Sequence, residues 1–204
     1  AMNNLKIILK NDTAKNSEFY VRTQEAIIQY IEFGLNYSQT TRDIQMAENV
    51  TKILTTSGVQ SKVFLWAHNL HVSKDKVQPN SPSMGHHLKD QYKNQYYSVG
   101  FDFATGKFNV YSITENRLTT ITIDKVMKNT SSETFNNSAL DNYLLDFKTA
   151  KKTSVLDDFL NSKVMHQGIG STYSPKMVIE ERLANSFDAL LFVKKTKEST
   201  LLRK

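Results

Sequence analysis

The pattern of hydrophobic and polar residues predicts two amphipathic helices in the first part of the chain. Within residues 17–36 the apolar side chains recur at helical spacing, and residues 40–55 show the same period. Gly34 and Asn36 stand where the first helix should end, and Gly58 lies just beyond the second. The chain therefore opens with two helices that each need a partner for one face.

A different pattern follows at residues 63–67, which read Val-Phe-Leu-Trp-Ala between Lys62 and His68. A short unbroken apolar run is typical of a strand buried on both faces, as in a parallel sheet covered by helices. The chain turns polar directly after this run. Ligand groups in open α/β sheets lie outside the carboxyl ends of the strands. We therefore expect His68, Asn69 and His71 to lie at a functional edge.

The rest of the chain alternates strand-like segments with short helices and contains no internal repeat. We expect helices at 85–92 and 155–161, strands at 96–103, 108–113, 118–123, 143–147 and 189–193, a turn at Gly106 and a loop at 129–138. This order predicts an α/β fold: one domain, with a largely parallel sheet, flanking helices and some antiparallel strands around 107–123.

Two charged residues share the apolar stripe of the second helix. Arg42 and Asp43 lie three to four residues before Met46 and Ala47, so they project from the same face. Charged groups rarely enter a buried face unless they are paired or functional. One reading makes them a cap and an ion pair at the helix start. The other places at least one of them within hydrogen-bond or ion-pair reach of His68 and His71.

The composition changes this picture only by exclusion. The formal net charge of +6 comes from scattered lysines rather than from a cluster, so we expect no nucleic-acid partner. No apolar run reaches the roughly 20 residues of a membrane span, and we expect a soluble protein, with the cytoplasm favoured and the compartment undetermined. The absence of cysteine excludes disulfides, thiolate catalysis and zinc–thiolate sites.

The chemistry of the two histidines stays open between two readings. One of them could simply hydrogen-bond the loop backbone, but the end of a predicted strand favours at least one facing a site. We expect no metal, because no cysteine or carboxylate stands at a fixed short offset from the pair. A Ser-His triad is disfavoured, because no Gly-x-Ser-x-Gly turn is present.

Several segments taken together resemble the erythromycin esterase family. They are Thr-Arg-Asp-Ile-Gln-Met-Ala-Glu-Asn-Val at 41–50, Leu-Trp-Ala-His-Asn-Leu-His-Val at 65–72, Met-Gly at 84–85, Tyr-Tyr-Ser-Val-Gly-Phe at 96–101 and Phe-Asp-Ala-Leu-Leu-Phe-Val at 187–193. The resemblance is tightest over residues 41–106. It implies an α/β fold and metal-independent hydrolysis of a macrolide lactone or a related ester by histidine-activated water, without a cofactor.

The resemblance also assigns roles to residues. It implies that His68, His71 and Arg42 are catalytic and that Asp43 and Asn69 support them. The residues that bind the substrate are unknown at this stage. The family's general base lies in a Gly-Glu-x-x-His-Gly-like motif of its N-terminal half. That motif is absent here, because His68 is the first histidine. We therefore expect this sequence to correspond to the C-terminal half of such an enzyme.

Two functions remain open at this stage. The first is an ester or lactone hydrolase that acts on a small molecule but is inactive as this chain alone. The second is a non-catalytic domain that keeps the fold and binds a ligand or a partner. We also expect homo-oligomers, because half of a sheet would leave an apolar edge uncovered.

Overall fold

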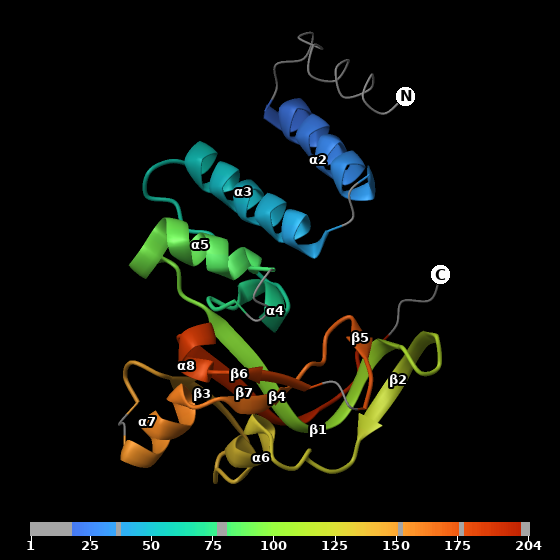
Figure 1. The fold of residues 1–204 in the computed structure, drawn as a ribbon, viewed down its shortest axis with the longest axis vertical. Coiled ribbons are helices and arrows are strands. Elements are labelled where there is room, and N and C mark those ends of the chain that lie inside the picture. Colours follow the sequence, from blue (N-terminus) through green and yellow to red (C-terminus); the bar gives the residue numbers. More distant parts are fainter. Residues whose placement is uncertain (1–17, 36–37, 77–80, 151–152, 176–177, 201–204) are drawn as a thin grey trace. The chain divides into compact units, whose positions relative to one another are not determined.

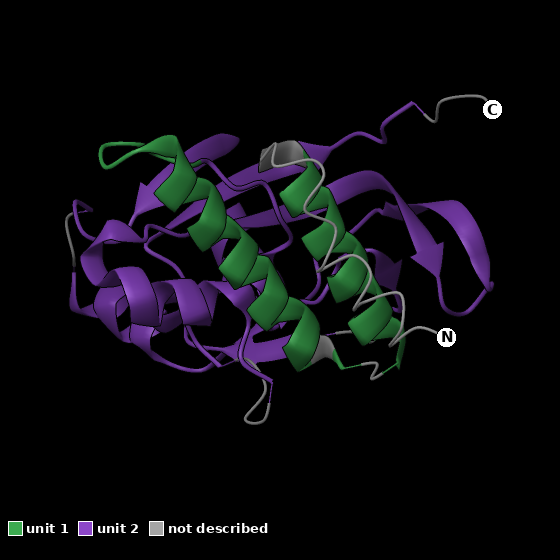
Figure 2. Cartoon of the chain, turned by 90° about the horizontal axis from the view of Figure 1, so that it is seen from above, with its two compact units in different colours: residues 1–63 green, residues 64–204 purple. Residues whose placement is uncertain are grey.

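The computed structural model describes residues 18–35, 38–76, 81–150, 153–175 and 178–200. The chain divides into two compact units, residues 1–63 and residues 64–204 (Figure 2). The expectation of a single domain stays a prediction.

Helices and strands alternate along the chain (Figure 1). The elements are α2 (Glu18–Leu35), α3 (Gln39–Ser57), α4 (Asn69–Val72), α5 (Met84–Tyr92), the 3-10 helix η1 (Lys93–Gln95), β1 (Val99–Ser112), β2 (Arg117–Ile123), α6 (Ser131–Asn136), β3 (Asn142–Asp146), α7 (Ser154–Asn161), β4 (Val164–Gln167), β5 (Thr172–Tyr173), β6 (Val178–Glu181), α8 (Leu183–Ser186) and β7 (Ala189–Thr196). The predicted helices at 17–36, 40–55, 85–92 and 155–161 and the predicted strands at 118–123, 143–147 and 189–193 are confirmed. The short elements α4, α8, β4, β5 and β6 are additions.

In unit 1, the described part consists of the helices α2 and α3. The side-chain amides of Gln29 and Asn49 exchange two hydrogen bonds of 3.0 and 2.8 Å between these helices. Along α3 the buried positions Asp43, Ala47 and Val50 follow helical spacing, as the sequence pattern predicts. Asp43 is only 4% exposed, so a carboxyl group does lie on the inner stripe.

In unit 2, a mixed sheet has the strand order β2-β1-β7-β3. Its central pair, β1 and β7, is parallel, whereas β2 and β3 pair in antiparallel fashion with β1 and β7. The short β5 adds a parallel contact to the end of β1, and β4 and β6 form a separate antiparallel pair. The α/β class is confirmed. More of the strand pairs are antiparallel than predicted, since β2 and β3 flank the parallel pair and run opposite to it.

The predicted turn at Gly106 is wrong, because β1 runs through this residue as one strand of 14 residues. Gly106 has a φ of +127°, and a Cβ there would lie 2.3 Å from the Thr196 carbonyl oxygen. The same residue pairs with Thr196 of β7 and with Ile123 of β2. Glycine therefore marks the point where β1 passes from one neighbour to the other, and only glycine fits that backbone.

The predicted strand at 63–67 is also wrong, because residues 61–68 form no helix or strand. The Phe64 and Trp66 side chains are 84% and 79% exposed rather than buried on two faces. A strand needs backbone partners, and the nearby backbone of Phe101 is already bonded by the Asn69 side chain. The apolar run instead forms an aromatic row, with Trp66 edge-on to Phe101 at 5.3 Å between centroids.

The predicted loop at 129–138 contains the helix α6, which is a further correction. The Glu133 carboxylate accepts a hydrogen bond from the Asn129 backbone N–H at 2.7 Å, which ties down the start of the helix. Phe135 is 5% exposed and meets Phe159 of α7 edge-on at 5.6 Å. Burial of this ring outweighs the weak helix propensity of the Ser- and Thr-rich sequence.

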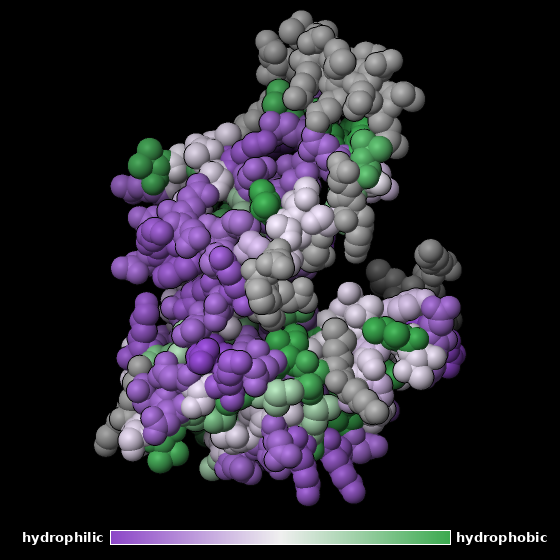
Figure 3. Space-filling view, viewed as in Figure 1, coloured by the Kyte–Doolittle hydropathy of each residue, from purple (hydrophilic) through white to green (hydrophobic). Residues whose placement is uncertain are grey.

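The core of unit 2 lies around β7 and the short helix before it. Leu183, Phe187, Leu190 and Phe192 are at most 1% exposed. On the face shown in Figure 3, exposed hydrophobic residues lie as small patches between hydrophilic ones. Searched over the described residues, no helix is long and apolar enough to cross a membrane.

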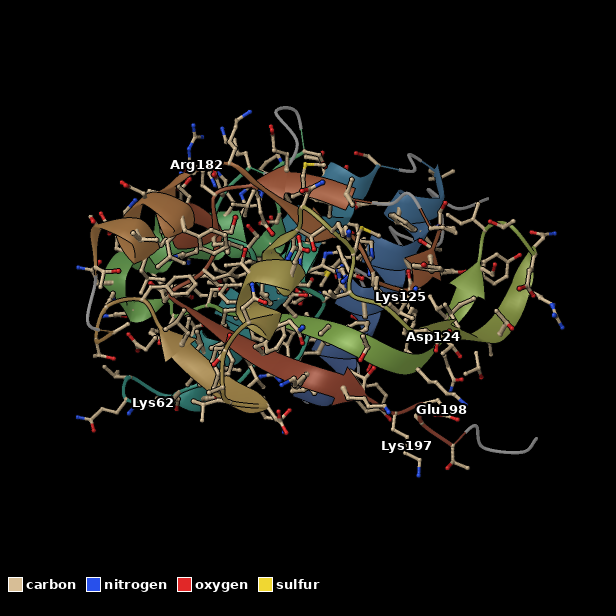
Figure 4. The ribbon with its side chains drawn as sticks, turned by 90° about the horizontal axis from the view of Figure 1, so that it is seen from below. Lys62, Asp124, Lys125, Arg182, Lys197 and Glu198 are labelled. Carbon is tan, nitrogen blue, oxygen red and sulfur yellow. The ribbon has the colours of Figure 1, made fainter. Side chains whose placement is uncertain are left out.

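The surface charges of unit 2 are mixed in sign. Lys125 follows Asp124, and Lys197 precedes Glu198, while Arg182 lies on the opposite side of the unit from Lys197 (Figure 4). Positive and negative side chains thus alternate at these positions. The expectation of no nucleic-acid partner stays a prediction.

Candidate functional site

A cavity of about 400 Å³ lies in unit 2 beside the first half of β1. Its lining combines aromatic, aliphatic and a few polar side chains: Trp66, Ala67, His68, Asn69, Phe101, Asp102, Phe103, Ile169, Val193 and Thr196. Largely apolar pockets with a few convergent polar groups are the usual form of small-molecule sites. His68 and Asn69, which the sequence marks as site residues, both line this cavity.

His68 caps the short helix α4 with its own side chain. Its Nδ1 accepts a 3.4 Å hydrogen bond from the Leu70 backbone N–H, so the proton of the neutral ring is on Nε2. That Nε2–H donates a hydrogen bond to the Ile169 carbonyl oxygen. The ring can approach so closely because residue 170 is glycine: a Cβ there would lie 2.9 Å from Nε2. Both nitrogens of His68 are thus engaged by backbone groups.

His71 belongs to the same helix and is half-buried. Its backbone N–H donates to the His68 carbonyl oxygen at 2.9 Å, so one helical turn holds the two histidines in a fixed relation. The reading in which one histidine serves the backbone applies to His68. A role for His71 in proton transfer stays a prediction.

Asn69 bonds the open edge of β1 as a neighbouring strand would. Its Nδ2 donates to the Phe101 carbonyl oxygen at 2.7 Å, and its Oδ1 accepts from the Phe101 N–H at 2.9 Å. The same Nδ2 lies 3.3 Å from Nε2 of His166. Asn69 therefore connects the histidine turn, the strand and a residue far along the chain.

A buried polar group lies behind Asn69; we name it the Asp102 cluster, and it consists of Asp102, Ser131, Ser132, His166 and Gln167. The Asp102 carboxylate accepts hydrogen bonds from Ser131 at 3.0 Å, from Ser132 at 2.8 Å and from the Phe103 N–H at 2.7 Å. The side chains of these residues are at most 6% exposed. These bonds satisfy the Asp102 carboxylate, since an unpaired group in the interior is costly, whereas Oε1 of Gln167 is buried without a hydrogen-bond partner among the described residues.

His166 is a buried residue of the Asp102 cluster that the sequence does not single out. Its Nδ1 lies 3.1 Å from Ser131 Oγ and 3.7 Å from Asp102 Oδ2, and the residue is 3% exposed. It stands in the four-residue strand β4, outside any motif. The available signal was Asp102, a charged residue among the mainly apolar residues 99–104, where a buried charge is expected to have a partner.

A second buried group in unit 2 has a different composition; we name it the Asp188 cluster, and it consists of Lys74, Tyr96, Ser98 and Asp188. Lys74 Nζ lies 3.0 Å from Asp188 Oδ1, with side chains 10% and 7% exposed, and the Ser98 N–H donates to Asp188 Oδ2 at 2.9 Å. The hydroxyls of Tyr96 and Ser98 both donate to the Val72 carbonyl oxygen, at 2.8 and 2.6 Å. Burial raises the pKa of Tyr96 to about 12.

Arg42 and Asp43 belong to unit 1, whereas His68 and His71 belong to unit 2, and the role expected for Arg42 and Asp43 beside the histidines stays a prediction. Within the described residues, no three histidine, aspartate, glutamate or cysteine side chains gather to hold a metal ion.

Comparison with known proteins supplies a context for this geometry. The family model described as erythromycin esterase matches residues 3–196. A Bacillus subtilis protein named "Putative hydrolase YbfO" is 26% identical over 194 residues, which cover 88% of this chain and 40% of that protein.

Solved structures share the fold. A Bacillus cereus protein has a TM-score of 0.74 at 20% identity, covering 96% of this chain and 51% of its own. A succinoglycan biosynthesis protein reaches 0.76 at 22%, covering 96% and 48%. An erythromycin esterase mutant in its open conformation reaches 0.59 at 16%, covering 95% and 51%. The chain spans about half the length of these structures.

Proposed function

Since this chain belongs to the erythromycin esterase family, we propose that it forms part of a hydrolase that cleaves an apolar carboxylic ester or lactone with histidine-activated water. The B. subtilis relative carries the name of a hydrolase, which supports the broad class. Because the chain spans only 40% of that relative, the activity, substrate and partners of a whole protein are all part of the proposal.

The observation that carries this proposal is the apolar cavity with the histidine turn in its lining. Trp66, Phe101 and Phe103 offer aromatic surface to the cavity, while His68 and Asn69 add polar groups to its wall. Aromatic rings contribute large apolar area with little loss of side-chain freedom, so they suit the apolar part of an ester. The polar groups would orient the ester function.

The roles divide between the two histidines. His68 holds the turn, because backbone groups engage both of its nitrogens. His71 would move protons as water adds to the carbonyl carbon and as the C–O bond to the leaving alcohol breaks. Arg42, with Asp43 beside it, would stabilise the developing oxyanion without titrating. The resemblance implies a further histidine base in a Gly-Glu-x-x-His motif that this sequence lacks, so we expect no turnover by this chain alone.

A non-catalytic binding domain is the second candidate, and the geometry of His68 favours it. A histidine whose nitrogens both serve the backbone cannot exchange a proton with water unless the turn opens. Binding without chemistry would need only the cavity.

Ligand binding can be measured with a reporter that the chain already contains. Trp66 is the single tryptophan and lines the cavity. We expect its fluorescence to change saturably when a macrolide lactone or a medium-chain aliphatic ester is titrated into the purified chain. Phe103→Ala should weaken this binding. Leu118→Ala, at a 58% exposed residue outside the cavity lining, is the matched control. A Trp66 signal that no ligand of either class changes would contradict the proposed site.

Turnover separates the hydrolase from the binding domain. This chain should be grafted in place of the matching residues of the B. subtilis relative and assayed with p-nitrophenyl esters. We expect hydrolysis that His71→Ala lowers by about 10²–10⁴-fold, the usual size of general acid–base assistance. Ligand binding without turnover in a folded graft would favour the binding domain. Turnover by this chain alone, lost in His71→Ala, would show that no further base is needed.

A further inference from the structure

The orientation of the Asn69 amide is fixed by β1. The Phe101 N–H needs an acceptor, so the atom 2.9 Å away must be Oδ1, and Nδ2 then donates to the Phe101 carbonyl oxygen at 2.7 Å. A side-chain amide has one acceptor and one donor end. The second N–H of Nδ2 is therefore the group presented to His166.

This orientation determines where the proton of His166 lies. Nε2 of His166 is 3.3 Å from a nitrogen that can only donate, so Nε2 must accept and carries no proton. A neutral ring then has its proton on Nδ1, which is 3.1 Å from Ser131 Oγ. A protonated imidazolium would instead place two N–H groups face to face at Asn69.

The Asp102 carboxylate sets the direction of the remaining bonds. It can only accept, so the Ser131 hydroxyl donates to it at 3.0 Å. The lone pairs of Ser131 Oγ are then free to accept from His166 Nδ1–H. The hydrogen bonds thus run in one sense, from Asn69 through His166 and Ser131 to Asp102. Ser131 is fully buried, so water does not compete for these bonds.

The position of this chain of bonds separates it from an ordinary buried network. Asp102 at one end and Asn69 at the other both belong to the cavity lining, and Asn69 adjoins His68. An apolar filling of the same space would stabilise the fold at least as well, because buried polar groups must first be desolvated. Its polar character is explained if it orients Asn69.

We propose that His166 is a positioning residue: held in its Nδ1–H tautomer by Ser131 and Asp102, it fixes Asn69 against β1 and thereby sets the histidine turn at the cavity. This inference rests on the proposed function for its relevance to catalysis. Its physical content, the tautomer and the anchoring of Asn69, is testable without any substrate.

The test is ¹⁵N NMR of the purified chain, with the His166 ring assigned through His166→Gln. We expect His166 to show a protonated Nδ1 and an unprotonated Nε2 near neutral pH, and Asn69 to give side-chain amide signals protected from solvent exchange. A wild-type ring with the proton on Nε2, or a charged ring, would overturn the proposal.

Two serine variants test the coupling. Ser131→Ala removes the acceptor of Nδ1–H, so we expect the other tautomer to grow and the Asn69 amide signals to shift and exchange faster. Ser186→Ala is the matched control: Ser186 is equally buried, and its Oγ has no partner among the described residues. It should leave both signals unchanged. If Asn69 is indifferent to Ser131→Ala in a folded protein, the anchoring role fails.

Ligand affinity, read from Trp66, links the result to function. We expect Ser131→Ala to weaken ligand binding by roughly two- to tenfold, the size of one net hydrogen bond, and Ser186→Ala to leave binding unchanged. A purely structural cluster would lower the melting temperature in Ser131→Ala and leave affinity intact. If no ligand changes the Trp66 signal of the unmodified chain, the proposed function fails, while the NMR signals still decide the role of His166.

Discussion

The two buried aspartates of unit 2 solve the same physical problem in different ways. Asp188 is 7% exposed and lies 3.0 Å from the Lys74 ammonium, so a positive charge compensates it. Asp102 is 5% exposed and is satisfied by two serine hydroxyls and a backbone N–H. In the pair of carboxylate and ammonium, the main effect is that each charge neutralises the other. A carboxylate held by hydroxyls remains a directional acceptor that can orient further groups.

The difference separates stability from function. The Asp188 cluster joins the segment after α4 to the start of β1 and to the residue before β7. Its Asp188 carboxylate also lies 3.9 Å from the exposed Lys148 ammonium, and none of its residues lines the cavity. The Asp102 cluster opens toward Asn69 and the cavity. Substitutions in the Asp188 cluster should therefore act mainly on the free energy of unfolding. Substitutions in the Asp102 cluster should also lower the affinity for a ligand.

The largest effect is expected for Asp188→Asn. This change leaves the Lys74 ammonium buried without its counter-charge and should lower the free energy of unfolding by about 3–5 kcal/mol in urea titrations. Asp141→Asn is the control, because Asp141 pairs with Lys194 at the same 3.0 Å but is 74% exposed. It should cost about 0–1 kcal/mol. Equal costs for both substitutions would show that burial adds nothing to the pair between Asp188 and Lys74.

Alkaline pH should act on the Asp188 cluster through Tyr96. Burial raises the pKa of this phenol from 10.0 to about 12, so above pH 10 the unfolded chain loses its proton while the folded chain keeps it. The stability is therefore fully present below pH 10 and falls as the pH rises toward 12, by up to about 2–3 kcal/mol.

Urea titrations at successive pH values measure this loss. Tyr96→Phe should flatten part of the slope between pH 10 and 12, and a residual slope is expected because burial also raises the pKa of Tyr143 to about 12. A slope identical in Tyr96→Phe would show that Tyr96 titrates normally.

A smaller loss of stability, about 1–3 kcal/mol, is expected for Asp102→Asn. The amide has the shape of the carboxylate but presents a donor toward Ser131. The serine must then accept from it and donate to His166, which reverses the direction of the bonds. We expect the His166 proton to move to Nε2, where it opposes the Asn69 amide. If the ¹⁵N spectrum of Asp102→Asn still shows the wild-type tautomer, the Asp102 carboxylate does not set the direction of these hydrogen bonds.

Self-association should give the smallest effect. The open edge of β1 carries the exposed rings of Phe64, Trp66 and Phe101, and such surfaces are usually covered. We expect dimers or larger species in light scattering as the concentration rises, and less association in Phe64→Lys. A monomer at every concentration would show that this edge needs no cover.

The sequence predicted the elements that have a strong local period, such as α2, α3 and β7. It also singled out His68 and Asn69, because a polar stretch after an apolar run is a local signal; both residues line the cavity, and their catalytic roles stay predictions. The prediction failed where contacts with distant residues determine the local structure. Residues 63–67 look like a buried strand, yet the Asn69 side chain holds the strand edge that they would need.

The Asp102 cluster lay outside sequence prediction for the same reason. Ser131 comes from a segment that reads as a loop, and His166 comes from a strand of four residues. Neither carries a signature of its own, because hydrogen bonds between distant segments depend on the tertiary fold. Asp102, a charged residue among the mainly apolar residues 99–104, could have indicated a buried partner, but not which residue that partner is.

The bond between Asn69 and His166 has a consequence for how the molecule is made. It joins residues 97 positions apart, and Ser131 meets Asp102 across 29 positions. Closing such long loops costs entropy before any contact compensates for it, so we expect these contacts to form late in folding. During synthesis the histidine turn leaves the ribosome nearly a hundred residues before its anchor. The cavity therefore acquires its final shape only after β1, α6 and β4 have all come together.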